Sequence, residues 1–160
     1  MPRITVEVES TIGSSIGRHD SPVPVEHDVS RAGGWPVGKG CVKGTLDTDG
    51  RSVRAMVLMQ EPARPGDEVA AWPVAVLHLS DGCHDLDEVV CVAEADPFVD
   101  LVDTADLGRW HAEPAAWAAA LGRLSPGSTY QVTGCSSRME ADQLMADAQH
   151  AYLQLTGSLE

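Results

Sequence analysis

The sequence predicts an α+β fold, in which a small closed or nearly closed β-barrel is flanked by two helices. Three observations predict it. Segment 4–10 alternates apolar and polar residues with a period of two, which is typical of a half-buried strand. Further strand-like segments follow as far as residue 94, and the last third of the chain changes to helical spacing. Short strands followed by a helix, a strand and a helix pack naturally as a barrel with the helices against it.

The N-terminal part supplies the first strand and its connections. Segment 11–20 is rich in glycine and serine and is predicted to be a loop. Segment 22–27 carries two prolines, which restrict it to a short edge strand.

The central part supplies most of the barrel. In residues 35–59 an Asp-Gly turn at 49–50 separates two predicted strands, the second over 53–59. Segment 68–79 is a long strand whose Pro73 predicts a bulge or an edge position. Segment 88–94 is almost continuously apolar, which predicts a strand buried on both faces.

The C-terminal third supplies the helices. An irregular acidic passage, 96–111, leads to a helix over 114–124 that begins with proline. A strand over 128–134 follows, and Ser137 and Glu140 have the spacing of a capping box before a final amphipathic helix. The apolar face of that helix is predicted to comprise Ala141, Leu144, Met145, Ala148, Ala151, Tyr152 and Leu155.

Length and composition indicate one domain, 1–160, with an ordinary globular core. Eleven basic against 24 acidic residues give a formal net charge of −13, which argues against binding nucleic acid or an anionic membrane. No apolar run has the length of a signal peptide or a membrane span. The four cysteines form no metal-binding pattern, so we expect reduced thiols in a cytoplasmic protein.

Two charged loops follow neighbouring predicted strands, and we expect them to face one cavity. The first carries Asp47, Asp49, Arg51 and Arg54, and the second is the segment 81–88, which contains four acidic residues and one histidine. The simplest interpretation is that both arginines pair with Asp47 and Asp49 in a solvated turn. The functional interpretation is that the arginines hold an anionic ligand, for which the guanidinium group is well suited.

The order of these turns resembles that of the soluble, magnesium-dependent family I inorganic pyrophosphatases. The family's Tyr-Pro-x-x-Tyr-Gly-Tyr and D-G-D-P-x-D runs correspond to 35–41 and 49–54. Its E-P-x-x-P-G and R-P-x-G-x-L-x-M-x-D runs correspond to 61–66 and 72–81. The resemblance implies a five-stranded barrel of the oligonucleotide-binding type with flanking helices, and assembly into a homo-oligomer.

The same resemblance implies a degenerate metal site. Asp49 keeps the first acidic position of D-G-D-P-x-D, whereas Arg51 and Arg54 stand at the other two. Glu88 stands where the family has a phosphate-binding lysine, and Lys39 where it has a central tyrosine. Family members need several carboxylates to hold Mg²⁺ ions, so cations at these positions argue against a multi-metal cluster.

These departures predict a pyrophosphatase fold repurposed as a metal-independent enzyme of a specialised biosynthetic pathway, not an ordinary inorganic pyrophosphatase. It would act on an anionic small molecule by acid–base or oxyanion chemistry. The predicted catalytic residues are Asp49, Asp81, His84 and Asp85, and the predicted substrate-binding residues are Lys39, Arg51 and Arg54.

Two alternative functions remain open. The first is a non-catalytic binding or regulatory protein, and the second is a weak, divergent magnesium-dependent inorganic pyrophosphatase. No cofactor is predicted, but a single Mg²⁺ held by Asp49, Asp81 and Asp85 remains an alternative for the site.

Overall fold

The computed structural model describes residues 3–14, 16, 35–95, 98–110, 112–125, 127 and 130–157. The expected edge strand at 22–27, and residues 15 and 17–20 of the loop expected at 11–20, lie outside the described residues. The elements are the strands β1 (Ile4–Ile12), β2 (Val37–Val42), β3 (Arg54–Leu58), β4 (Glu68–Ser80), β5 (Asp85–Ala93) and β6 (Gln131–Ser136), the 3-10 helix η4 (Thr104–Trp110), and the helices α1 (Pro114–Leu124) and α2 (Arg138–Leu155).

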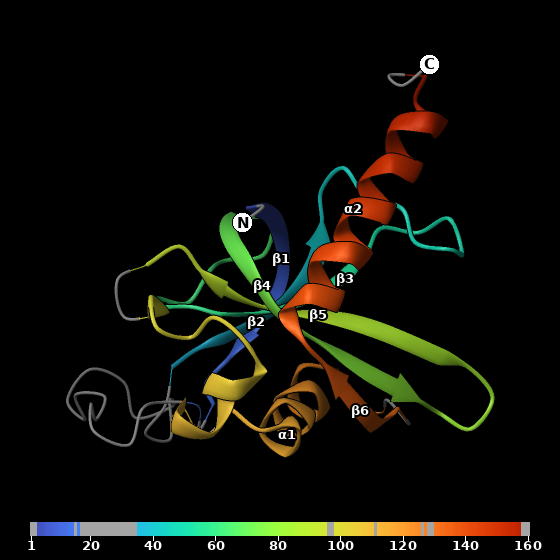
Figure 1. Cartoon of the computed structure of the whole chain (residues 1–160). Helices are drawn as coiled ribbons and strands as arrows, with labels where there is room; N and C mark the ends of the chain where they lie inside the picture. The colour runs from blue at the N-terminus through green and yellow to red at the C-terminus, as the bar shows by residue number, and fades with distance from the viewer. Residues whose placement is uncertain are drawn as a thin grey trace.

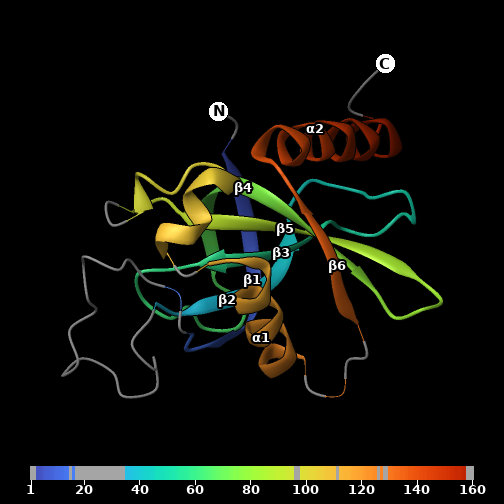
Figure 2. The same ribbon diagram turned by 60° about the horizontal axis from the view of Figure 1, so that its bottom comes forward.

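Five strands close into a ring. Within the described part of the chain the sheet order is β1-β2-β3-β5-β4-β6, and β1 also pairs with β4. The β3–β5 pairing is parallel and the others are antiparallel. The strand β6 continues the sheet outside the ring, and α1 and α2 lie against different parts of it (Figures 1 and 2). The predicted α+β class, a five-stranded barrel with two flanking helices, is confirmed, with β6 as an addition.

Two bulges shape the ring. The pairing of β4 with β5 shifts register between Pro73 and Ala75, which confirms the bulge predicted at Pro73. The pairing of β1 with β2 shifts between Val8 and Ser10, so Glu9 occupies an extra position. Opposite this bulge β1 and β2 approach so closely that a side chain at Gly40 would overlap the Glu7 carbonyl group.

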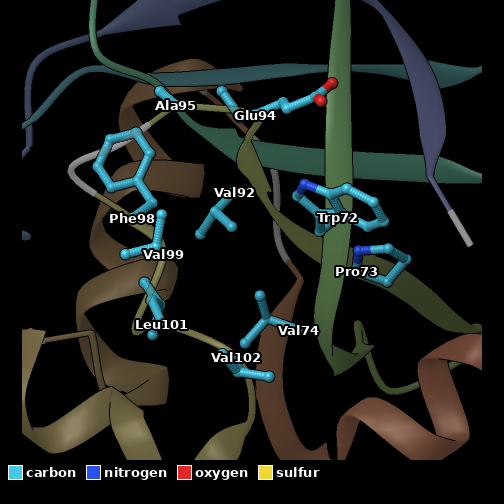
Figure 3. A pocket seen from close by; sticks show the side chains of 11 residues that line it. Trp72, Pro73, Val74, Val92, Glu94, Ala95, Phe98, Val99, Leu101 and Val102 are labelled. Carbon is cyan, nitrogen blue, oxygen red and sulfur yellow. The ribbon is translucent and has the colours of Figure 1, made fainter. Parts of the chain in front are cut away.

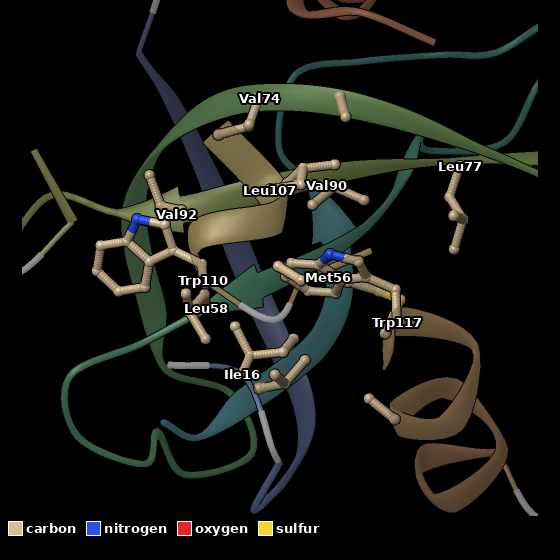
Figure 4. Close-up of a cluster of buried hydrophobic side chains, with 14 of the residues drawn as sticks. Ile16, Met56, Leu58, Val74, Leu77, Val90, Val92, Leu107, Trp110 and Trp117 are labelled. Atoms are coloured by element: carbon tan, nitrogen blue, oxygen red, sulfur yellow. The ribbon is translucent and has the colours of Figure 1, made fainter. Parts of the chain in front are cut away.

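Two buried clusters hold the elements together. One joins the sheet to η4 and α1 and includes Met56, Val90, Trp110 and Trp117 (Figure 4). The other joins the opposite side chains of the strands to α2, through Ala141, Met145 and Ala148 among others. Because side chains alternate along a strand, each central strand contributes to both clusters.

The final helix differs from the prediction in two respects. Ser137 is its N-cap but makes no side-chain cap hydrogen bond, so the predicted capping box does not form. The predicted apolar face is buried only as far as Ala148, because Tyr152 and Leu155 are exposed. Figure 1 shows the C-terminal end of α2 projecting away from the sheet. Of the helices that the structure describes, none has the length and apolar character needed to cross a membrane.

Candidate functional site

Charged side chains from four neighbouring strands form one cluster. Cys41 of β2 is the register partner of Arg54 of β3, and Arg54 is in turn the partner of Glu88 of β5. Lys39, two residues before Cys41, lies on the same face of β2, and the bulge in β1 adds Glu9. We call these five residues the Arg54 cluster.

Arg54 is held by two hydrogen bonds to one carboxylate. Its Nη1 and Nη2 atoms donate to Glu9 Oε2 and Oε1 at 2.8 and 2.9 Å. The hydrogen bonds from Arg54 lower the pKa of Glu9 to about 2, so this carboxylate stays ionised at neutral pH. The interpretation in which Arg54 pairs with Asp47 and Asp49 is therefore wrong. The β1 bulge, which no sequence signal marks, brings Glu9 to the arginine.

The thiol of Cys41 donates to Glu9 Oε2 at 3.0 Å. Burial, followed by this hydrogen bond, raises the pKa of the thiol, which disfavours the reactive thiolate. All four cysteines are free, as expected.

Lys39 connects the cluster to α1. Its Nζ atom donates to Ser125 Oγ at 2.7 Å, and Ser125 is the C-cap residue of α1. The end of this helix therefore lies beside the cluster, where Figure 2 shows α1 next to β2.

Glu88 is the least expected member of the cluster. Its side chain is fully buried, and within the described part of the chain neither carboxyl oxygen has a hydrogen-bond partner. Burial raises the pKa of Glu88, although the positive charges of Lys39 and Arg54 oppose the shift. The neutral form of Glu88 is therefore favoured more strongly than in an ordinary glutamate.

The second charged loop is built around Asp81. Its Oδ1 atom accepts hydrogen bonds from the backbone N–H groups of Cys83 and His84 at 2.8 and 2.7 Å, which lower the pKa of Asp81. The His84 ring is 78% exposed, with Nδ1 3.8 Å from Asp81 Oδ2. Asp81 thus shapes the turn, and His84 and Asp85 are exposed beside it.

The first charged loop is likewise organised by a carboxylate. Asp47 Oδ1 accepts hydrogen bonds from the backbone N–H groups of Asp49 and Arg51 at 2.9 and 3.0 Å. Asp49 and Arg51 are exposed, and among the described residues Arg51 makes no ion pair. The predicted role of Arg51, to hold an anionic ligand in place of a magnesium ion, stays a prediction.

The two charged loops face one groove, as predicted, but only some of the predicted site residues line it. A groove of about 560 Å³ between the two loops and α2 is lined by Asp49 and Asp85. Lys39 and Arg54 do not line it, because consecutive residues of a strand face opposite sides. Val53 and Asp87 line the groove, whereas Arg54 and Glu88, which follow them, belong to the Arg54 cluster.

The residues present do not fit a cluster of resident magnesium ions. No three histidine, cysteine or acidic side chains in the described ranges gather closely enough to hold a metal ion, and this includes Asp49, Asp81 and Asp85. The Arg54 cluster contains two cations, which would repel a divalent ion.

A second cavity of about 430 Å³ is almost wholly apolar (Figure 3). Trp72 and Pro73 of β4 line one side of it, and Phe98 and Val102 line the other. Among the described residues that line it, Glu94 is the single acidic one. The described lining contains no basic side chain that could bind a phosphate group.

Comparison with known proteins identifies the family. A sequence model of the family described as "Inorganic pyrophosphatase" matches residues 6–153. The inorganic pyrophosphatase of Aeropyrum pernix is 28% identical over 153 residues, covering 93% of this chain and 87% of that protein. That of Methanosarcina mazei is 35% identical over 72 residues, covering 45% of this chain and 43% of that protein.

Solved structures show the same fold. The inorganic pyrophosphatase of Helicobacter pylori superposes with a TM-score of 0.66 at 23% identity, covering 94% of this chain and 93% of that chain. That of Thermus thermophilus superposes with a TM-score of 0.65 at 20% identity, covering 94% and 91%.

These findings correct the functional expectation. The predicted metal-independent enzyme of a specialised biosynthetic pathway is wrong, as is the prediction that the chain is not an ordinary inorganic pyrophosphatase, because the family match and the relatives favour pyrophosphatase activity. The charge of Arg54 counts for less than the sequence alone suggests, because the fold places the acidic residues Glu9 and Glu88 beside it. Since the match extends through all strands of the ring and most of α2, this protein belongs to the inorganic pyrophosphatase family.

Proposed function

We propose that this protein hydrolyses inorganic pyrophosphate to two phosphate ions. The observation that carries the proposal is the family match over residues 6–153, which includes both charged loops and the whole Arg54 cluster. The reaction breaks one bridging P–O bond, adds one water molecule and requires an anionic substrate, which the family implies.

The Arg54 cluster suits the binding of phosphoryl oxygens. Lys39 and Arg54 carry positive charges, Glu9 is ionised, and the neutral form of Glu88 is favoured. The cluster thus brings two cations together inside a protein of net charge −13, and burial opposes the ionisation of Glu88 beside them. Phosphoryl transfer depends mainly on positioning and on stabilising negative charge, which such cations supply.

Magnesium enters this proposal as part of the substrate, since Mg²⁺ in phosphate chemistry is commonly bound through substrate oxygens and few protein ligands. The predicted roles of Asp49, Asp81, His84 and Asp85 in activating water, and of Arg51 in holding phosphate, stay predictions. Asp49, Arg51, His84 and Asp85 are exposed in two turns that hydrogen bonds to Asp47 and Asp81 hold, which is compatible with contact to a bound ligand.

The direct test is phosphate release from pyrophosphate in the presence of magnesium chloride. We expect turnover by the wild-type protein and at least a ~10-fold loss of kcat/KM for Lys39→Ala and for Arg54→Ala, as for the removal of one charged contact. Lys43→Ala is the matched control, because Lys43 lies next to β2 but pairs with Glu68 in solvent. Absence of turnover by the wild-type protein would contradict the proposal, and pyrophosphate binding without turnover would favour the non-catalytic alternative.

We also propose that the protein forms a homo-oligomer and works in the cytoplasm. Tyr152, Leu153 and Leu155 are exposed together at the C-terminal end of α2, and a group of exposed apolar side chains suits contact with a second copy of the chain. The free cysteines support a reducing compartment. Sedimentation at several concentrations, and fractionation of the producing cells, test the two statements. A monomer at all concentrations, or recovery outside the cytoplasm, would contradict them.

A further inference from the structure

Three polar side chains on β4, β5 and β6 form a continuous hydrogen-bonded chain. His78 Nδ1 lies 2.7 Å from Asp87 Oδ1, and His78 Nε2 lies 2.6 Å from Ser136 Oγ. His78 and Asp87 are register partners, and Ser136 is the last residue of β6. Figure 1 shows β6 running from the sheet directly into α2.

The order of these contacts defines the proton positions. The ionised carboxylate of Asp87 can only accept a hydrogen bond, so in the neutral imidazole Nδ1 carries the proton. Nε2 of His78 then has a free lone pair, and the hydroxyl group of Ser136 donates to it. This is the arrangement in which a histidine acts as a general base toward a serine nucleophile.

The chain lies on the edge of the acidic groove and away from the Arg54 cluster. His78 and Asp87 line the groove, and their side chains are 34% and 46% exposed. Asp47, Asp85 and Asp147 add carboxylates to the same groove. A cleft lined by one sign of charge concentrates ligands of the opposite sign.

We propose that Ser136, His78 and Asp87 form a second catalytic site, which hydrolyses carboxylic esters of cationic alcohols. Ser136 Oγ attacks the ester carbonyl carbon while its proton moves to His78 Nε2. The ester C–O bond then breaks, and the leaving alcohol takes that proton. Water attacks the acyl-serine in the same way, which releases the carboxylic acid and restores Ser136.

The experiment uses acetylcholine and its uncharged isostere 3,3-dimethylbutyl acetate, with acetate release followed by NMR on the full chain. We expect hydrolysis of acetylcholine, and Ser136→Ala should lower kcat by at least ~10³-fold and Asp87→Asn by at least ~10²-fold. Ser137→Ala, which removes the neighbouring hydroxyl group, is the matched control and should keep the wild-type rate. The uncharged isostere should react at least ~10-fold less efficiently at low salt, and this difference should shrink as salt is added.

A second readout separates chemistry from folding. A fluorophosphonate probe should label the wild-type protein once, and peptide mass spectrometry should locate the label at Ser136. The same probe should not label Ser136→Ala, and an unchanged circular dichroism spectrum shows that this variant is folded. Pyrophosphate hydrolysis should be the same in wild type and Ser136→Ala, so the two proposed activities fail independently. Equal acetate release by wild type and Ser136→Ala, labelling at another residue, or no preference for the cationic ester would overturn the proposal.

Discussion

The burial of Glu88 has two consequences, one for the stability of the fold and one for the charge of the Arg54 cluster. A buried carboxyl group without a hydrogen-bond partner destabilises a protein, and more so when it is ionised. The same burial favours its neutral form, so Glu88 neutralises less of the positive charge of Lys39 and Arg54 than an exposed glutamate would. The sequence places Glu88 at the start of an apolar run but does not reveal its burial, which depends on the strands on either side.

We predict that Glu88→Gln stabilises the protein at pH 7 by about 1 kcal/mol or more, because it removes the cost of ionising a buried group. The pKa of Glu88 is higher in the folded than in the unfolded state, so the folded state binds more protons between the two values. Wild-type stability should therefore fall as the pH rises from the unfolded pKa, 4.5, through the folded pKa. Urea unfolding across this range measures the difference.

The difference between the two proteins should vanish at a pH well below 4.5, where both side chains are neutral. A pH-independent difference would show that shape, and not ionisation, decides the effect.

At the scale of the elements, the register of β3 and β5 decides which charges are neighbours. Arg54 and Glu88 are direct partners across the pairing, so the two strands hold one base and one acid side by side. The bulge in β1 adds Glu9 to the same place. The effect of Arg54 on the local charge therefore depends on two acids that only the fold places beside it.

We predict that the charges of Arg54 and Glu88 are energetically coupled. Arg54→Asp leaves Glu9 without its partner, and Glu88→Lys places a third cation beside Lys39, so each single variant should lose about 1–3 kcal/mol. The double variant should recover at least half of the summed loss, which gives a coupling energy of about 1–3 kcal/mol by urea unfolding.

The control for this cycle is the exposed ion pair of Lys43 and Glu68, with 50% and 52% exposed side chains. Reversing both of its charges should give a much smaller coupling energy, because solvent screens an exposed pair. Additive losses in the Arg54 and Glu88 variants would mean that the two residues do not interact.

The close approach of β1 and β2 gives a second prediction for the elements. Gly40→Ala should destabilise the protein by about 2 kcal/mol or more, because a methyl group there overlaps the Glu7 carbonyl and forces β1 away. Gly122→Ala is the matched control. It lies in α1 with no atom within 4 Å of the added methyl group, and should stabilise by about 1 kcal/mol.

Thermal unfolding of both variants measures these effects. Equal tolerance of alanine at the two positions would show that the β1–β2 contact can adjust without cost.

At the scale of the whole molecule, the net charge of −13 produces self-repulsion in the compact state. We predict that raising the ionic strength from about 0.01 M to about 0.15 M increases stability by about 1 kcal/mol, because the screening length falls from about 30 to about 8 Å. For a protein of this size that corresponds to about 2–4 °C in Tm by calorimetry. A Tm that is constant or falls with added salt would show that local ion pairs outweigh the general repulsion.

The sequence by itself determined the class of fold, since strand alternation, turn residues and helical spacing are local properties. The bulge at Pro73 and the helix Pro114–Leu124 were predicted for the same reason. Only the tertiary structure decided which charges meet. Glu9 reaches Arg54 through a bulge, Glu88 becomes buried next to it, and the strand period separates both from the groove that Asp49 and Asp85 line. Electrostatic balance depends on distances between strands far apart in the chain, and these distances exist only after the ring has closed.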